Sequence, residues 1–283
     1  MSIKKIGVVG AGAMGTGIAH VAAQAGYEVV LCDVAEEFLK RSVASMSKLI
    51  DKAIAKGKLT ETDKTETLGR IKITTDLQAM QDVDLVVEAI IEKIEAKLDL
   101  FARLDKICAP HALITSNTST MSITKMAKVT QRPDKVAGLH FFNPAQAMKL
   151  VEIIRGYYTS DETVAFLKEC VTTMGKVGIE VKKDTPGFVV NRLMLPQIRE
   201  AFILHEQGVA SMEDIDKAMT LGLNHPMGPF TLMDFAGNDI CLASLEYLYA
   251  EFAEPHWAPP ISLKQLINAG RMGKKVGKGW YDY

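Results

Sequence analysis

The run Ile6-Gly-Val-Val-Gly-Ala-Gly-Ala-Met-Gly15 decides the fold of this chain. Ile6 to Val9 is a short apolar segment of the kind that forms a buried strand, and a helical apolar pattern starts where the run ends. Between them, Gly10, Gly12 and Gly15 have the spacing GxGxxG. Gly10 would allow a tight turn, Gly12 would let a pyrophosphate approach the backbone, and Gly15 would let the helix pack close to the strand. This order predicts a dinucleotide-binding turn, in which the N–H groups at the helix start face the phosphates.

Asp33 ends the next predicted strand, which covers residues 28–31. A carboxylate at this position accepts hydrogen bonds from the adenosine ribose of a dinucleotide. Its charge would disfavour a 2′-phosphate by up to a few kcal/mol at ~4 Å, and Val34 to Glu37 contain no arginine to offset the repulsion, so we expect NAD rather than NADP. The alternative is a glycine turn that binds nothing, followed by a solvated acidic residue. The expected cofactor contacts at this end are Gly10, Gly12, Ala13, Met14, Gly15 and Asp33.

Strand-like and helix-like segments continue to alternate after this first unit. Apolar runs at 84–90, 112–116, 135–140 and 150–154 predict strands, and 36–56, 95–107 and 160–175 predict helices. Such alternation predicts an α/β fold with a mainly parallel, doubly wound sheet of the Rossmann type. The turn Asp184-Thr-Pro-Gly187 ends the alternation, and the segments beyond it, starting with a helix over 188–205, are helical. We predict an NAD-binding domain over residues 1–185 and an all-α domain over 186–283.

The composition argues against several classes of protein. The 283 residues are 48% hydrophobic and 24% charged with a formal net charge of −1, so nothing global attracts nucleic acid or an anionic membrane. No segment reaches the ~20 apolar residues of a membrane helix, and the chain starts as a strand without room for a signal peptide. The four cysteines, at 32, 108, 170 and 241, have no metal-site spacing. We expect a cytoplasmic protein without a metal, a nucleic-acid partner or a membrane partner.

Polar residues gather where the predicted strands end, which is where an open α/β sheet binds its ligands. His140 is the sharpest candidate, because a neutral imidazole can accept an alcohol proton near pH 7. Glu152, on the following strand, could pair with this imidazole, fix its tautomer and stabilise its cation. A half-buried histidine with ordinary partners and a solvent-facing Glu152 are the alternatives. The strand-end residues are Glu88, Glu92, Ser116 to Ser119, His140 and Asn143.

Several longer runs resemble the 3-hydroxyacyl-CoA dehydrogenases, most closely their bacterial 3-hydroxybutyryl-CoA branch. Gly138-Leu-His-Phe-Phe-Asn-Pro-Ala-Gln-Ala-Met-Lys-Leu-Val-Glu152 resembles a signature of this family, and so does Asp184-Thr-Pro-Gly-Phe-Val-Val-Asn-Arg192. The resemblance extends to Ser116-Asn-Thr-Ser119, Met227-Gly-Pro-Phe230 and Gly273-Lys-Lys-Val-Gly-Lys-Gly-Trp-Tyr281, and so covers essentially the whole chain.

The resemblance implies a role for each matching residue. It makes His140 the catalytic base and Glu152 its carboxylate partner. Ser119 and Asn191 match positions that contact the 3-oxygen of the substrate or polarise its carbonyl. Taken without the resemblance, Ser119 would be a polar turn residue, and the buried amide of Asn191 would bond backbone or face a cleft. The residues implied near the nicotinamide half of NAD are Glu92, Lys97, Asn117, Ser119, Asn143 and Lys275.

Lys52 and Lys56 match positions that contact the phosphates of CoA. They are four residues apart on a predicted helix and therefore face the same way. That arrangement suits a polyanion, and it equally suits an ordinary solvated helix face.

The resemblance implies reversible, NAD-dependent hydride transfer between an (S)-3-hydroxyacyl-CoA, with 3-hydroxybutyryl-CoA expected, and its 3-oxoacyl-CoA. It also implies a homodimer formed through the C-terminal domain. Two rival interpretations stay open. One is a dehydrogenase of the same fold that oxidises a free 3-hydroxy acid, and the other is a dinucleotide-binding sensor or structural protein without catalysis.

Overall fold

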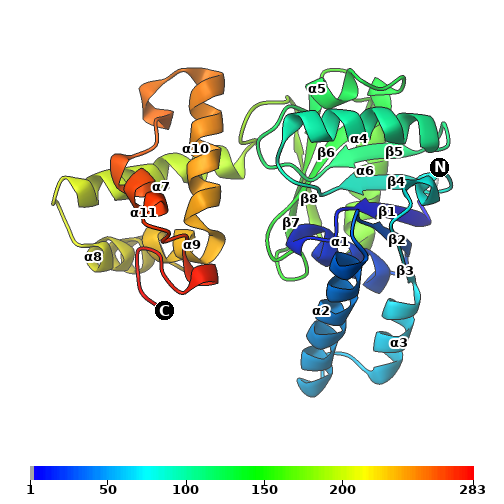
Figure 1. Cartoon of the computed structure of the whole chain (residues 1–283), viewed down its shortest axis with the longest axis horizontal. Helices are drawn as coiled ribbons and strands as arrows, with labels where there is room; N and C mark the ends of the chain where they lie inside the picture. The colour runs from blue at the N-terminus through cyan, green and yellow to red at the C-terminus, as the bar shows by residue number, and fades with distance from the viewer. Residues whose placement is uncertain (1–2) are drawn as a thin grey trace. The chain divides into compact units, whose positions relative to one another are not determined.

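The computed structural model describes residues 3–283, and the chain divides into two units. The first ends at Thr185 and contains the eight strands of the described chain, and the second, Pro186–Tyr283, is built from helices (Figure 1). This architecture confirms the predicted fold class. Within residues 3–283, no helix is both long and apolar enough to cross a membrane, and no group of three or more His, Cys, Asp or Glu is arranged to hold a metal ion.

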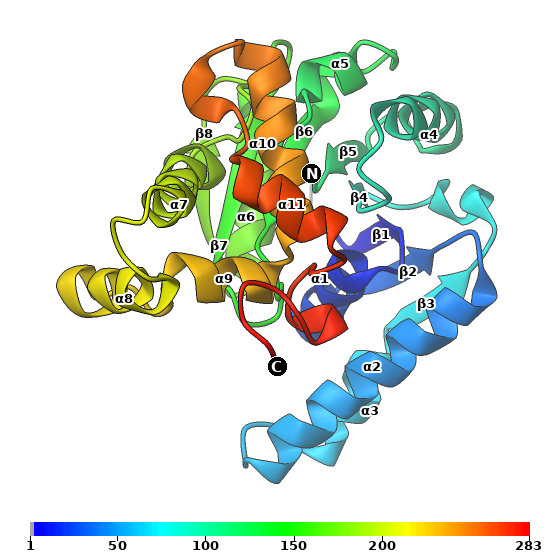
Figure 2. The ribbon, with the colours of Figure 1, turned by 60° about the vertical axis from the view of Figure 1, so that its left-hand side comes forward.

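The eight strands form one sheet in the order β3-β2-β1-β4-β5-β6-β7-β8 (Figure 2). All neighbouring strands are parallel except β6 and β7. The order 3-2-1-4-5-6 is that of a doubly wound dinucleotide-binding sheet. The strands are β1 (Lys5–Val9), β2 (Glu28–Cys32), β3 (Ile71–Thr74), β4 (Leu85–Glu88), β5 (Leu113–Ser116), β6 (Val136–Phe141), β7 (Leu150–Arg155) and β8 (Val177–Val181).

Helices cover both faces of this sheet. α1 and α6 share one apolar core with alternate strand residues, whereas α5 and a 3₁₀ helix, η1, approach the strand glycines of the opposite face. Because side chains alternate along a strand, His140 and Glu152 point away from the face that α1 and α6 cover. The helices are α1 (Ala13–Gln24), α2 (Glu36–Ala55), α3 (Glu61–Gly69), η1 (Leu77–Met80), α4 (Ile94–Ile107), α5 (Ile123–Ala127), η2 (Pro133–Lys135) and α6 (Asp161–Thr173).

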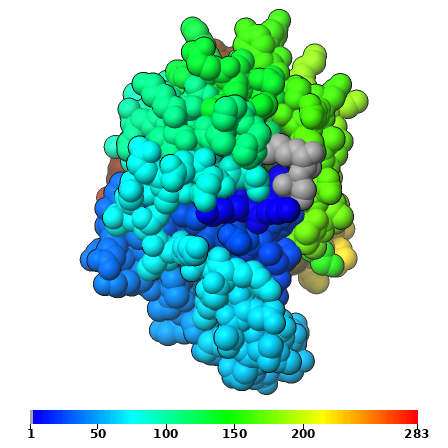
Figure 3. Space-filling view, turned by 90° about the vertical axis from the view of Figure 1, so that its right-hand side faces the viewer, coloured from blue at the N-terminus to red at the C-terminus, as the bar shows by residue number. Residues whose placement is uncertain are grey.

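The ends of α2 and α3 project from the rest of the first unit (Figure 3). An ion pair of 2.5 Å between Lys64 Nζ and Asp51 Oδ1 joins the two helices. A capping box between Thr60 and Asp63 starts α3. The sequence predicts neither α3 nor β3, because α3 buries only Thr67 and β3 is an edge strand with no fully buried residue.

The second unit packs its helices around an aromatic core. The ring centroids of Phe202, Phe230 and Trp280 lie 4.5 to 5.2 Å apart, and all three side chains are buried. Apolar residues of five α-helices and one 3₁₀ helix belong to the same core. The helices are α7 (Val190–Glu206), α8 (Met212–Lys217), the π-helical η3 (Ala218–Gly222), α9 (Pro229–Ala236), α10 (Asn238–Phe252), η4 (Pro255–Trp257), α11 (Ile261–Asn268) and η5 (Lys274–Val276).

The first helix of this unit begins later than the sequence predicts. α7 starts at Val190 rather than at Phe188. Gly187 has φ +77° and Phe188 has φ +48°, so both residues are left-handed and stand outside the helix. Apolarity alone predicts the helix but not this turn, because the sequence pattern carries no signal for a left-handed phenylalanine.

Candidate active site

A histidine and a glutamate meet across the antiparallel strands β6 and β7. The register places His140 directly opposite Glu152, and Nδ1 of the imidazole lies 2.7 Å from Oε2 of the carboxylate. His140 is 6% exposed and Glu152 0% exposed, so water screens their interaction little. The carboxylate favours the tautomer that carries a proton on Nδ1, which assigns proton exchange with a ligand to Nε2. The structure therefore brings together the two residues that the sequence singles out for acid–base chemistry.

Two neighbours hold this part of β6. Oδ1 of Asn117, just beyond β5, accepts a hydrogen bond of 2.8 Å from the backbone N of Phe141. The ring of Phe142 lies 4.5 Å from the imidazole of His140, centroid to centroid. Asn117 thus ties the loop after β5 to the strand that carries His140.

A second ionic group lies where β4 and β5 end. Glu88, the last residue of β4, is 0% exposed, and Lys97 of α4 is 1% exposed. Nζ of Lys97 lies 2.6 Å from Oε1 of Glu88 and 2.9 Å from Oε2 of Glu92. The hydroxyl of Ser116 donates to the other oxygen of Glu88 at 2.5 Å. Glu88 is thus the buried centre of this group. In the sequence, only its position at the end of a predicted strand singles out Glu88.

Glu92 connects this group to Ser119. Its Oε1 accepts hydrogen bonds from the hydroxyl of Thr118 and, at 3.2 Å, from the backbone N of Ser119. The side chain of Glu92 is 41% exposed, so its carboxylate reaches the surface of the unit. The structure therefore joins three residues predicted for the site, Glu92, Lys97 and Ser119, in one network.

The glycine loop has the geometry of a phosphate-binding turn. Gly10 has φ +107°, and a Cβ there would lie 2.4 Å from the carbonyl oxygen of Ala89. A Cβ at Gly15 would lie 1.8 Å from the carbonyl oxygen of Gly10. At Gly12, by contrast, nothing lies within 4 Å of the Cβ position, so the space above the helix start is open to a phosphate.

Asp33 is bound to the same loop. Its Oδ2 accepts a hydrogen bond of 2.6 Å from the backbone N of Ala11, and its Oδ1 one of 3.3 Å from Ala35 N. A cavity of about 600 Å³ opens here. Among its lining residues are Gly10, Gly12, Asp33, Val34, Leu77 and Ile90.

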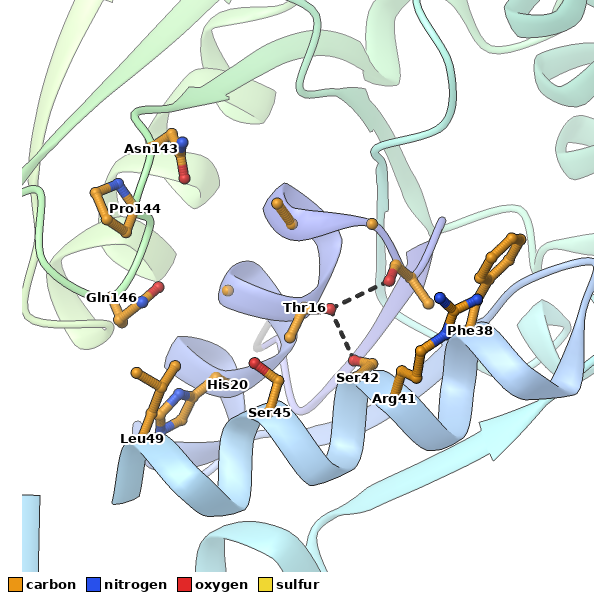
Figure 4. Close-up of a pocket in the computed structure, with 14 residues that line it drawn as sticks. Thr16, His20, Phe38, Arg41, Ser42, Ser45, Leu49, Asn143, Pro144 and Gln146 are labelled. Carbon is orange, nitrogen blue, oxygen red and sulfur yellow. Dashed lines mark hydrogen bonds between the residues drawn. The ribbon is translucent and has the colours of Figure 1, made fainter. Parts of the chain in front are cut away.

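A second cavity, of about 380 Å³, lies between α1, α2 and the loop after β6 (Figure 4). The hydroxyl of Thr16 bonds Ser42 Oγ at 2.8 Å and the carbonyl of Ala11 at 3.2 Å, which ties α1 to α2 at its edge. Asn143 and Gln146 line the cavity from the loop.

Two family models cover the chain almost from end to end. The model described as "3-hydroxyacyl-CoA dehydrogenase, NAD binding domain" matches residues 5–185, and that described as "3-hydroxyacyl-CoA dehydrogenase, C-terminal domain" matches residues 187–283. The chain belongs to the 3-hydroxyacyl-CoA dehydrogenase family. It is an NAD-dependent 3-hydroxyacyl-CoA dehydrogenase, and the predictions of the family and of NAD as cofactor are confirmed.

Known members resemble this dehydrogenase along its whole length. The probable 3-hydroxybutyryl-CoA dehydrogenase of Bacillus subtilis is 46% identical over 283 residues, which are 100% of this chain and 98% of the relative. The crystal structure of (S)-3-hydroxybutyryl-CoA dehydrogenase PaaH1 from Ralstonia eutropha is 45% identical with a TM-score of 0.95, covering 100% and 99% of the two chains. The structure of FadB2 from Mycobacterium tuberculosis has a TM-score of 0.97 at 41% identity, covering 100% of both chains.

The residues of the dehydrogenase fit NAD. The open space at Gly12 would fit a pyrophosphate, and the cavity beside Asp33 would fit the adenosine half. Arg41, one turn into α2, is paired with Glu37 at 2.8 Å, so its charge is already compensated. Arg103 lines the same cavity as Asp33 and lies 3.6 Å from the carboxylate of Asp99, so it too has an acidic neighbour. These charges are consistent with a preference for NAD over NADP.

The remaining predicted residues lie elsewhere in the chain. Lys52 is exposed near the end of α2 and Lys56 is exposed at its C-cap, and neither lines the cavities described above. In the second unit, Asn191 is partly buried in the first turn of α7. Nζ of Lys275 lies 2.6 Å from both carboxylate oxygens of Asp239. Their roles toward CoA, the substrate and NAD stay predictions.

Proposed function

We propose that this dehydrogenase interconverts (S)-3-hydroxybutyryl-CoA and acetoacetyl-CoA, with His140 as the acid–base and Glu152 as its partner. The observation that carries the proposal is the buried contact of 2.7 Å between His140 Nδ1 and Glu152 Oε2. The choice of a C4 acyl group is supported by the 3-hydroxybutyryl-CoA dehydrogenases among its relatives.

The proton chemistry follows from this pair. In the oxidation direction, Nε2 of His140 takes the proton of the 3-hydroxyl while the hydride leaves C3. Glu152 orients the ring and stabilises the imidazolium that forms. In the reduction direction, the imidazolium returns its proton to the oxygen at C3. NAD, held at the glycine loop and Asp33, would supply the hydride acceptor in oxidation and the hydride donor in reduction.

The other predicted residues would bind and orient the acyl-CoA substrate. The hydroxyl of Ser119 would hold the reacting oxygen or the thioester carbonyl, and the resemblance to the family gives Asn191 the same role. Glu92 supports Ser119 through the backbone N–H that it accepts at 3.2 Å. Lys52 and Lys56 would bind the CoA phosphates, because both are cations on one exposed side of α2.

The first experiment follows NADH absorbance with acetoacetyl-CoA, with free acetoacetate and with NADPH in place of NADH. We expect fast oxidation only for NADH with the CoA ester. Equal rates with free acetoacetate would replace the thioester by a free 3-oxo acid as the substrate class. NADH binding without turnover on either compound would support a dinucleotide-binding protein without catalysis.

The second unit would also form a homodimer. Apolar side chains are exposed on α7, α9 and α10, namely Leu193 at 69%, Phe235 at 53% and Ile240 at 56%. Such side chains on the outside of a helical unit suit burial against a second copy. Light scattering coupled to gel filtration should give twice the chain mass of 31.0 kDa. A monomer at micromolar concentration would contradict the dimer.

A further inference from the structure

His20 is a buried histidine with two unpaired ring nitrogens. It lies on α1 and is 4% exposed, and within residues 3–283 neither Nδ1 nor Nε2 has a hydrogen-bond partner. Burial lowers the pKa of His20, so the ring is neutral near pH 7 and offers one N–H donor and one acceptor nitrogen. Buried polar groups in folded proteins are nearly always hydrogen-bonded, so these two atoms lack partners that a molecule bound beside the ring would supply.

The cavity of about 380 Å³ described above lies next to this ring. His20 is one of its lining residues, beside Ser45 and Leu49 of α2, and Gln146 lines the opposite wall (Figure 4). The lining is mixed, with the hydroxyl of Ser45 and the amide of Gln146 next to aliphatic carbon. Such a lining suits a flexible ligand that alternates amide groups with short carbon chains.

The lining of this cavity continues along α2 toward the two predicted phosphate-binding lysines. Successive spacings of four, four, three and four residues place the stripe on one side of the helix. At 1.5 Å per residue the stripe is about 22 Å long, which suits an extended CoA. The stripe consists of Arg41, Ser45, Leu49, Lys52 and Lys56.

This order along α2 points to the part of CoA that would reach His20. With the phosphates at Lys52 and Lys56, the pantetheine arm extends toward the cavity. Each secondary amide of that arm presents one N–H donor and one carbonyl acceptor. A neutral imidazole presents the same two functions, so either nitrogen of His20 would gain the complementary partner.

We propose that His20 hydrogen-bonds an amide of the pantetheine arm and makes the dehydrogenase selective for CoA thioesters over short thioesters. The inference rests on the proposed function. It treats His20 as a specificity residue that takes no part in proton transfer to C3.

The test compares acetoacetyl-CoA with S-ethyl acetothioacetate, a thioester of the same acyl group without amides. For His20→Leu we expect kcat/KM to fall about 10- to 100-fold with acetoacetyl-CoA, mainly through KM, and to stay within about twofold with the ethyl thioester. His20→Gln should recover most of the loss, because its amide also has a donor and an acceptor. His111→Leu is the matched control, because His111 is half-exposed and pairs with Asp84, just before β4 at the other end of the strands.

The binding of NADH, followed by its fluorescence, separates this role from one in cofactor binding. The dissociation constant of NADH should not change in His20→Leu. An equal loss with both thioesters, no loss with either, or weaker NADH binding would each overturn the proposal. Should His20→Leu not fold, His20→Asn, whose amide is too short to reach the same group, must show the same substrate-dependent loss.

The two proposals fail differently. If the wild-type chain has the same kcat/KM with the ethyl thioester as with acetoacetyl-CoA, the proposal of a CoA substrate itself is wrong. If the wild type prefers acetoacetyl-CoA and His20→Leu keeps that preference, only the inference about His20 is wrong.

Discussion

Glu152 and Glu88 are two fully buried carboxylates at the same edge of one sheet, and their partners differ. Glu152 contacts the imidazole of His140 at 2.7 Å, and Glu88 contacts the ammonium of Lys97 at 2.6 Å. An imidazole exchanges protons near neutral pH, whereas a lysine ammonium ordinarily stays protonated there. In the proposed mechanism the same acid thus supports proton transfer in one pair, and in the other pair it compensates a buried charge. Burial alone does not distinguish a carboxylate that would assist proton transfer from one that compensates a buried charge.

The largest effect should come from the imidazole of the first pair. We expect His140→Ala to lower kcat by about 10²- to 10⁴-fold, the usual contribution of a positioned acid–base, with NADH binding kept. Steady-state kinetics with acetoacetyl-CoA and NADH fluorescence measure the two quantities. Glu152→Gln, which keeps the shape but not the charge, should lower kcat less. Near-normal turnover of His140→Ala would remove this residue from the chemistry.

A substitution in the Glu88–Lys97 pair should change the free energy of unfolding rather than kcat. We expect Glu88→Gln to lower the free energy of unfolding by about 1–3 kcal/mol, because a buried ammonium loses one of its two anionic partners. The kcat should stay within about tenfold of wild type. Urea denaturation and steady-state kinetics check both.

Glu92→Gln is the matched control for this comparison. The side chain of Glu92 is 41% exposed, so losing its charge should cost less stability than the loss at Glu88. A large fall of kcat in Glu88→Gln without any loss of stability would contradict this distinction. Both buried pairs would then act in turnover.

Asp33 is a third carboxylate at this edge, and its partners are backbone N–H groups. Because Oδ2 accepts from Ala11 N at 2.6 Å, Asp33→Asn is expected to keep the loop while removing the charge. The preference for NADH over NADPH, taken as the ratio of kcat/KM, should fall about tenfold. Asp33→Ala should narrow the same ratio and also raise KM for NADH. An unchanged ratio would place the selectivity in other residues.

Glu180 on β8, with its side chain 20% exposed, provides the partly buried counterpart and the smallest effect. Hydrogen bonds from Lys168 and Arg155 lower the pKa of Glu180 to about 2 from an ordinary value of 4.5. A lowered carboxyl pKa contributes stability above the ordinary value, and this contribution disappears as the pH falls toward 2. At pH 7, Glu180→Gln should therefore cost less than about 1 kcal/mol. Unfolding curves of the wild type and variant should converge between pH 4.5 and 2, and parallel curves would contradict this assignment.

Local patterns in the sequence are sufficient for the architecture. The glycine loop, Asp33 at the next strand end and the alternation of strands and helices predict the doubly wound sheet, because each signal lies within a few neighbouring residues. α3 and β3 escape prediction because they bury little apolar surface. The predicted start of α7 is wrong because Phe188 takes a left-handed conformation that its residue type does not predict.

The residues of the candidate site also fall into those that the sequence predicts and those that only the structure reveals. His140, the glycine loop, Glu92 and Ser119 are recognisable from residue type and strand-end position, and the resemblance to the family adds Lys97. The connection of Glu92 and Ser119 to Glu88 runs through Lys97 and follows only from the fold, because it depends on α4 packing this lysine against the end of β4. His20 was not singled out by the sequence at all, since an unpaired ring is visible only when every neighbour is placed.

The sequence by itself determined the dinucleotide turn, the class of fold, and which histidine ends a strand, because these depend on the order of residues along one chain. The tertiary structure decided which carboxylate serves that histidine. β7 reverses direction beside β6, and this reversal sets residue 152 opposite residue 140. Such a register depends on which strands pair and in which direction, and the strand pattern of either segment alone does not contain it.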